Sequence, residues 1–93
     1  MGVFHNGELA ERLTDDDLAL LRAVVAVKRT QDEPFLASFV DGDANLARAH
    51  WLSRASRVWF EFDAPGAHPV DGWHLDLQLA EAGSDRGVHL RVS

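Results

Sequence analysis

The sequence contains no cysteine. Disulfides, thiolate nucleophiles and zinc sites with cysteine ligands are therefore excluded. Because small secreted domains commonly depend on disulfides, this absence favours a cytoplasmic protein. The N-terminal segment MGVFHNGELAER has no apolar signal core, and no apolar run approaches the length of a membrane span. We therefore expect no membrane association.

Basic residues are also scarce, at 9 against 15 acidic residues, which gives a net charge of −6. Three of the nine basic residues fall in the stretch RAHWLSRASRVWFEFD, residues 48–63, and no acidic residue lies between Asp43 and Glu61. Outside this stretch the chain is strongly acidic. General affinity for nucleic-acid phosphates is disfavoured, because such binding requires clustered cations.

The length of 93 residues and the hydrophobic content of 46% indicate one domain, residues 1–93, with a small core. Thr14 is a typical helix N-cap, and three aspartates follow it where the helix dipole favours acids, which predicts a helix over Asp15–Thr30. Asn6-Gly7 predicts a type I′ hairpin turn. The predicted strands are Gly2–His5, Glu8–Leu13, Phe35–Val40, Ala49–Ser53, Arg57–Asp63 and 88–92.

The segment 71–82 fits two patterns. Three alternating leucines are typical of a strand, whereas Trp73, Leu77 and Ala80 fit one stripe of a helix that begins after Asp71. The capping residues at both ends favour the helix. The predicted order is then ββαβββαβ, an α+β fold in which two helices pack on an antiparallel or mixed sheet.

The basic stretch is the strongest candidate for a binding surface. If Arg57–Asp63 is a strand with Val58, Phe60 and Phe62 inward, Trp59 faces outward. Tryptophan and arginine are enriched at protein interfaces. The predicted surface comprises Arg48, Trp51, Arg54, Arg57 and Trp59. The alternative is that other side chains cover Trp59 and that the arginines pair with neighbouring acids.

Motifs for metals and catalysis are weak. His68, Asp71 and His74 are spaced three residues apart, so they could meet at a helix start, but no specific zinc motif surrounds them. The run Asp41–Asn45 copies the first, third and fifth positions of a calcium loop, but it lacks the turn glycine and the final glutamate. No nucleophile elbow or phosphate-binding glycine loop is present. We predict no metal, no cofactor and no catalysis.

Four segments carry a resemblance to a known family: DDDLALLRAVVAVKR, EPFLASF, WLSRASRVWFEF and SDRGVHLRV. Together they resemble a family of uncharacterised proteins of roughly a hundred residues from high-GC Gram-positive bacteria. Members tend to have a Tyr-Gly type of first hairpin, a glycine where this chain has Ala47, and a proline within the segment matching Ser53–Arg57. This chain departs from the family at all three places.

Some members of that family are labelled ATP-dependent DNA ligases. Such ligases carry AMP on the lysine of a K-x-D-G motif. The only lysine here is Lys28, which is followed by Arg29-Thr30-Gln31, and the chain is too short for a nucleotidyltransferase domain. The resemblance therefore does not imply autonomous ligase activity.

These observations predict a non-catalytic cytoplasmic domain that acts through a protein partner or through self-association, including a homodimer. A second interpretation stays open, in which the arginines between Arg48 and Arg57 bind an anion or nucleic acid in an accessory role. Salt dependence separates the two, since phosphate binding weakens steeply as salt rises.

Overall fold

The order of the elements confirms the predicted fold class. The computed structural model describes residues 1–42 and 46–92. The elements are β1 (Gly2–Asn6), β2 (Leu9–Leu13), α1 (Asp15–Gln31), β3 (Phe35–Asp41), β4 (Leu46–Leu52), β5 (Val58–Glu61), α2 (Gly72–Ala82) and β6 (Val88–Arg91). This is the predicted ββαβββαβ order of an α+β fold.

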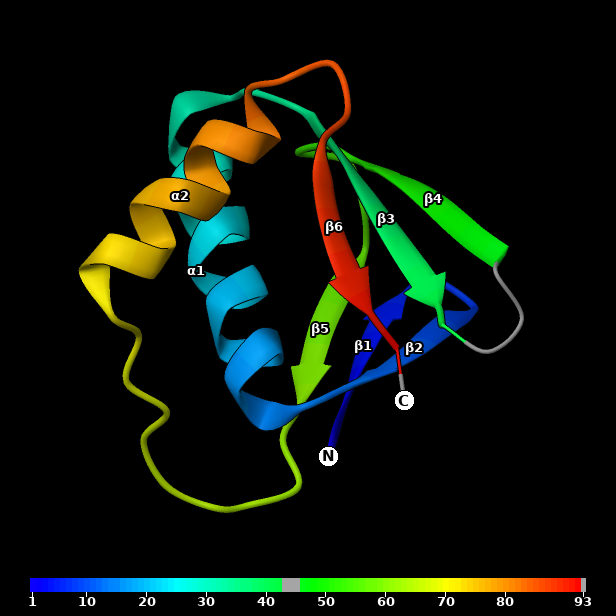
Figure 1. Ribbon diagram of the computed structural model, residues 1–93, viewed down its shortest axis with the longest axis vertical. Helices are drawn as coiled ribbons and strands as arrows, with labels where there is room; N and C mark the ends of the chain where they lie inside the picture. The colour runs from blue at the N-terminus through cyan, green and yellow to red at the C-terminus, as the bar shows by residue number, and fades with distance from the viewer. Residues whose placement is uncertain (43–45, 93) are drawn as a thin grey trace.

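The strands form two three-stranded sheets (Figure 1). In the first sheet, β1 lies between β2 and β5 and is antiparallel to both. In the second sheet, β3 lies between β4, which is antiparallel to it, and β6, which is parallel. The inner faces meet where Phe4 stacks on Phe39, with ring centroids 5.3 Å apart. The two sheets therefore share one core, and their outer faces point away from it.

Helix α1 closes one side of this core. Its N-cap Thr14 accepts a hydrogen bond at 3.1 Å from the amide of Asp17, and its buried stripe includes Leu18, Leu21 and Val24. The helix ends one residue later than predicted. Asp32 adopts the left-handed conformation, with a φ of 54°, and its N–H bonds to the carbonyls of the last turn. Helix α2 lies beside α1 at the same edge of the strands (Figure 1).

Helix α2 settles the ambiguity of segment 71–82 in favour of a helix, capped by Asp71 and Gly83. Trp73, Leu77 and Ala80 are exposed, whereas the opposite side of the helix faces the core. That inner side consists of Leu75, Gln78, Leu79 and Ala82.

The first hairpin turns one residue later than predicted. Asn6 pairs with Leu9 as the last residues of the two strands, which leaves Gly7 and Glu8 as the loop. Of these two loop residues only Gly7 has a positive φ, of 61°. A type I′ turn needs positive φ at both positions. The predicted turn type was therefore wrong, although the hairpin itself is confirmed.

Two strands differ from their predicted bounds by more than one residue at one end. Strand β4 begins at Leu46, where it pairs with Asp41 of β3. The prediction missed this start because the inward positions 48 and 50 carry polar side chains, which hide the alternation. Strand β5 ends at Glu61, and its pairing with β1 ends at the same point, where Glu61 lies opposite Val3. Phe62 still packs against the core, beyond the end of the strand.

Candidate interaction surfaces

The residues of the basic stretch 48–63 are divided between the two sheets. Arg48 and Trp51 lie in β4, Trp59 lies in β5, and Arg54 and Arg57 lie in the connection between these strands. Strands β4 and β5 belong to different sheets whose inner faces pack together. The five residues therefore do not form one continuous surface.

Arg48 is held in a polar network between the sheets. Its Nε and Nη2 donate to both carboxylate oxygens of Glu11, at 2.8–3.0 Å. Glu11 is only 3% exposed, and it also accepts a 3.0 Å hydrogen bond from Nε2 of buried His50. Nδ1 of His50 accepts a 3.1 Å hydrogen bond from the side-chain amide of Asn6. The hydrogen bond and the charge of Glu11 raise the pKa of Arg48 above its usual value.

The other two arginines are exposed. Nη1 of Arg54 lies 3.9 Å from a carboxylate oxygen of Asp32, and both side chains are largely in solvent. The carbonyl of Arg57 accepts a 2.8 Å hydrogen bond from the amide of Gly7, which continues the pairing of β1 with β5. Two of the three arginines are therefore paired with acids, as the structural alternative predicted.

Trp59 faces outward, as predicted, and is 50% exposed. Its indole is stacked on the imidazole of His5, with centroids 4.5 Å apart and ring planes within 6°. Nε2 of His5 in turn lies 3.1 Å from Oε1 of Glu61. One face of this indole is therefore already used within the protein.

Trp51 lies on the outer face of the sheet formed by β4, β3 and β6 and is 62% exposed. In Figure 1 both helices lie to one side of these strands and neither covers this face. Strand alternation and register place eight side chains there. They are Leu36, Ser38, Val40, Ala47, Ala49, Trp51, His89 and Arg91. None of them is acidic, and five of them are apolar. We call this set the Trp51 face.

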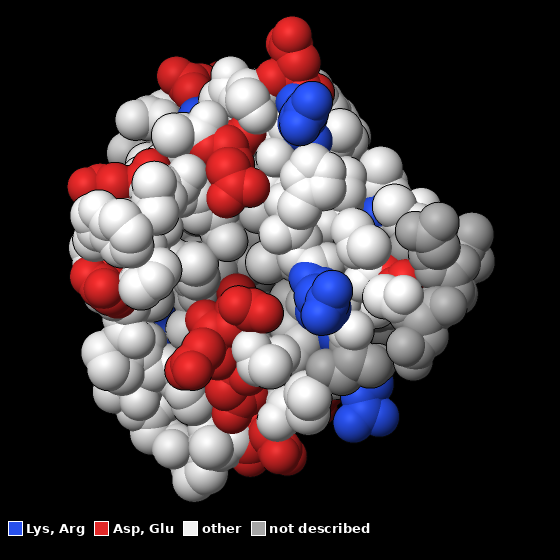
Figure 2. Space-filling model, viewed as in Figure 1, with Lys and Arg blue, Asp and Glu red and all other residues white. Residues whose placement is uncertain are grey.

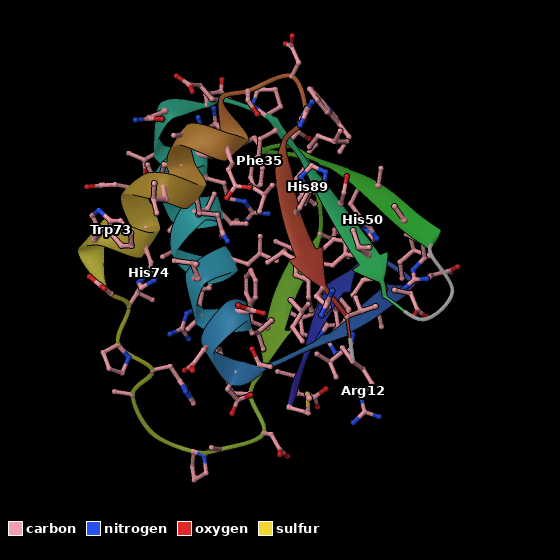
Figure 3. The ribbon with its side chains drawn as sticks, in the orientation of Figure 1. Arg12, Phe35, His50, Trp73, His74 and His89 are labelled. Carbon is pink, nitrogen blue, oxygen red and sulfur yellow. The ribbon has the colours of Figure 1, made fainter. Side chains whose placement is uncertain are left out.

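A hollow of about 420 Å³ adjoins the Trp51 face at the start of β3. Leu36 and Trp51 belong to both the face and the hollow, and buried Phe35 and Ala82 also line it. Figure 3 shows Phe35 at this end of β3, near the last turn of α2. A side chain of a partner lying across the Trp51 face could enter this hollow.

Trp73 marks a third surface, on the outer side of α2, and is 66% exposed. Leu77 follows it at i+4 and is 48% exposed. The sequence analysis placed these residues on one helical stripe but did not identify that stripe as a surface. The available signal was the second apolar stripe of the same helix, through Leu75 and Leu79, since both stripes cannot face the core.

Of the three candidate metal ligands, Asp71 and His74 contact each other, whereas His68 contacts the backbone. Asp71 accepts from the amide of Trp73 at 3.0 Å and lies 2.9 Å from Nδ1 of His74. The first of these contacts lowers the pKa of Asp71 below its usual value, and the second adds to the effect. Nε2 of His68 donates to the carbonyl of Ala64 at 2.8 Å.

Within residues 1–42 and 46–92, no group of three or more His, Asp or Glu side chains could hold a metal ion. Asp43 to Asn45 of the proposed calcium loop lie outside the described residues. Over the same described ranges, no helix is long and apolar enough to cross a membrane.

Comparison with known proteins gives one match. No curated protein and no solved structure matches the chain. A family profile described as a domain of unknown function matches residues 1–93, the whole length of the sequence given. The chain therefore belongs to that family, DUF7882.

Proposed function

We propose that this domain is non-catalytic and binds a short segment of another protein across the Trp51 face. The observation that carries the proposal is the 62% exposure of Trp51 on an apolar sheet face that no helix covers. Exposed apolar surfaces of this kind mark interaction sites in monomeric proteins. Tryptophan is enriched among binding hot spots, which cluster in well-packed pockets of an interface.

The size of the face favours a segment over a second copy of the chain. Three strands about 4.8 Å apart and up to seven residues long cover about 300 Å². A standard interface needs about 800 Å² from each partner. A single strand, loop or helix fits the smaller area, whereas a stable homodimer needs more.

The chemistry of the face defines the segment. Leu36, Val40 and Trp51 offer apolar contacts, and the only full charge on the face is that of Arg91. We therefore infer a mainly apolar segment that places one side chain in the hollow beside Trp51 and a polar or acidic group near Arg91. The net charge of the whole chain, −6, opposes the approach of a second copy.

The arginine-based alternative has less support. An anion site requires several free cations in one place. Arg48 is bonded to Glu11 through two nitrogens, and Arg54 lies near Asp32. For the setting of the protein we keep the sequence-based proposal of a bacterial cytoplasm, which rests on the absence of cysteine and on the family resemblance.

Site-specific photocrosslinking in cells tests the proposed function. A photoreactive phenylalanine analogue replaces Ala49, which is exposed on the Trp51 face, in the full chain. The control places the same analogue at Ala10, an exposed residue of the other sheet that pairs with His5. We expect a crosslinked protein at position 49 and none at position 10.

The crosslinked protein is then purified and its affinity measured. The Trp51→Ala variant should bind it at least about tenfold more weakly than the parent, whereas Trp59→Ala should bind equally well. Equal affinity of Trp51→Ala and the parent would overturn the proposal. A crosslink between two copies of this chain at position 49 would also contradict it, because the occupant would then be a homodimer.

A further inference from the structure

Helix α2 is apolar on two opposite sides, although only one of them faces the core. Its inner side packs through Leu75, Leu79 and Ala82. At 100° per residue, Trp73, Leu77 and Ala80 fall within about 60° of one another on the opposite side. A helix that is apolar all round is normally buried on both sides. This one leaves Trp73 66% and Leu77 48% exposed.

Figure 3 shows that Trp73 projects from the outer side of α2, away from the strands that carry His50 and His89. The ridge formed by Trp73, Leu77 and Ala80 therefore lies apart from the Trp51 face. Trp73 makes one ring contact, edge to face with its neighbour His74, at 5.2 Å. That contact leaves the ridge open to solvent.

Acidic side chains flank this ridge on both sides. By the same helical geometry, Asp76 lies about 60° to one side of Trp73, and Glu81 lies about 80° to the other. Both are exposed, and α2 contains no lysine or arginine. Figure 2 shows acidic side chains around uncharged surface over the helices, while the basic side chains lie mainly over the strands.

We propose that the α2 ridge is a second docking site, and that its occupant is a basic amphipathic helix of a partner protein. The apolar side of that helix packs along Trp73 and Leu77, since residues spaced by four form the ridges through which helices pack. Lysine or arginine side chains on its flanks meet Asp76 and Glu81. The domain then joins two partners, one on the Trp51 face and one on α2.

The test uses two synthetic helical peptides, each about four turns long, with leucines along one side. In the first peptide all other positions are lysine, and in the second they are glutamate. Binding to the full chain is measured by calorimetry, and the contact is located by NMR shifts of the three indole N–H groups. We expect the lysine peptide to bind and to shift the Trp73 indole, and the glutamate peptide not to bind.

Matched variants separate docking on α2 from general attraction to an acidic protein. Trp73→Ala should weaken binding of the lysine peptide at least about tenfold. Leu77→Ala should weaken it more than Leu9→Ala, which removes a leucine that is 60% exposed on β2. Asp76→Asn and Glu81→Gln should each weaken it about threefold. Glu8→Gln, which removes the same charge from the first hairpin, should leave it unchanged.

The inference is overturned if both peptides bind equally well, if neither binds, or if Trp73→Ala binds the lysine peptide as tightly as the parent. Circular dichroism confirms that each variant is folded before its affinity is compared. The Trp51→Ala variant should bind the lysine peptide normally. Failure of this site is therefore distinguishable from failure of the Trp51 face.

Discussion

The outer faces of the two sheets each carry one tryptophan, but the two side chains have different surroundings. On the β2–β1–β5 sheet, Trp59 is stacked on His5, and His5 contacts Glu61. On the β4–β3–β6 sheet, Trp51 has no ring contact with any part of the chain that the structure describes. Similar exposed fractions, 50% and 62%, therefore conceal different availability for a partner. Exposure identifies a binding tryptophan only when its internal contacts are counted as well.

The same contrast holds for two pairs of glutamate and histidine. Glu11 and His50 lie 3.0 Å apart between the sheets, with side chains 4% and 3% exposed. Glu61 and His5 lie 3.1 Å apart on the outer face of the first sheet, with side chains 67% and 22% exposed. The distances are nearly equal, but the first pair is buried and Glu11 also accepts hydrogen bonds from Arg48. The buried pair connects the two sheets, whereas both residues of the exposed pair belong to one sheet.

The largest loss of stability should come from a change in the core where the two sheets pack together. Phe4 is fully buried and stacks on Phe39 of the other sheet. Phe4→Ala should lower the free energy of unfolding by about 3–5 kcal/mol. Urea unfolding should show both sheets lost in one transition, followed through the fluorescence of single-tryptophan variants that retain Trp51 or Trp59. Two separate transitions would show that the sheets are independent units.

The next largest loss of stability should distinguish the two glutamate–histidine pairs. Glu11→Gln should cost about 2–3 kcal/mol, because the amide replaces a buried acceptor on which three donor nitrogens converge. Glu61→Gln should change stability by less than about 0.5 kcal/mol, because its pair is exposed. Chemical denaturation of both variants under the same conditions measures the difference. Equal costs would mean that the buried network does not hold the sheets together.

Much of the fold followed from local patterns. The capping residues at Thr14 and Asp71, and the alternation around Trp59, act within a few residues, so the sequence alone predicted both helices and the outward direction of Trp59. The length of β4 was missed because its inward positions hold Arg48 and His50, which satisfy their polar groups with a distant strand. No local pattern reveals such long-range partners.

The candidate site was harder to predict for the same reason. Arg48 and Trp59 are close in sequence, but the chain changes sheets between β4 and β5, so proximity along the chain did not give proximity in space. The absence of nearby acids in the sequence was equally misleading, since Glu11 reaches Arg48 from β2. For α2 the two apolar stripes were both visible, and only packing against α1 shows which one is buried.

A smaller difference in stability should separate the alanine variants of the two tryptophans in the unbound protein. Trp59→Ala removes the stack on His5 and should destabilise the domain by about 0.5–1 kcal/mol. Trp51→Ala removes an exposed side chain without an aromatic partner and should change stability by less than about 0.5 kcal/mol. Thermal unfolding of the two variants measures this. A larger cost for Trp51→Ala would show that its indole supports the fold and would weaken its assignment to a partner.

The smallest expected effect is a loss of stability in acid. It should be confined to the chain just after β5, a strand of the first sheet. Asp15 in α1 accepts hydrogen bonds from the amides of Ala64, at 3.0 Å, and Asp63, at 3.2 Å, just after β5. The bond from Ala64 is the main cause that lowers the pKa of Asp15 below its ordinary value of 3.8, and the nearby N-terminal amine and His68 add to it. Because the folded pKa is the lower one, the stabilisation is complete above pH 3.8 and is lost as pH falls through the folded value.

The chain after β5 should therefore loosen in acid while the second sheet does not. The NMR shift of the Ala64 amide, which donates to Asp15, should change as the pH falls below 3.8. The amide of Val92, which donates to the carbonyl of Val40 at 3.0 Å on the other sheet, should stay constant. In Asp15→Asn the acid step at the Ala64 amide should be largely lost, because the carboxylate to which it donates is gone. A step that persists in this variant would assign the acid response to another group, and a step of equal size at Val92 would make it global unfolding rather than a difference between the two sheets.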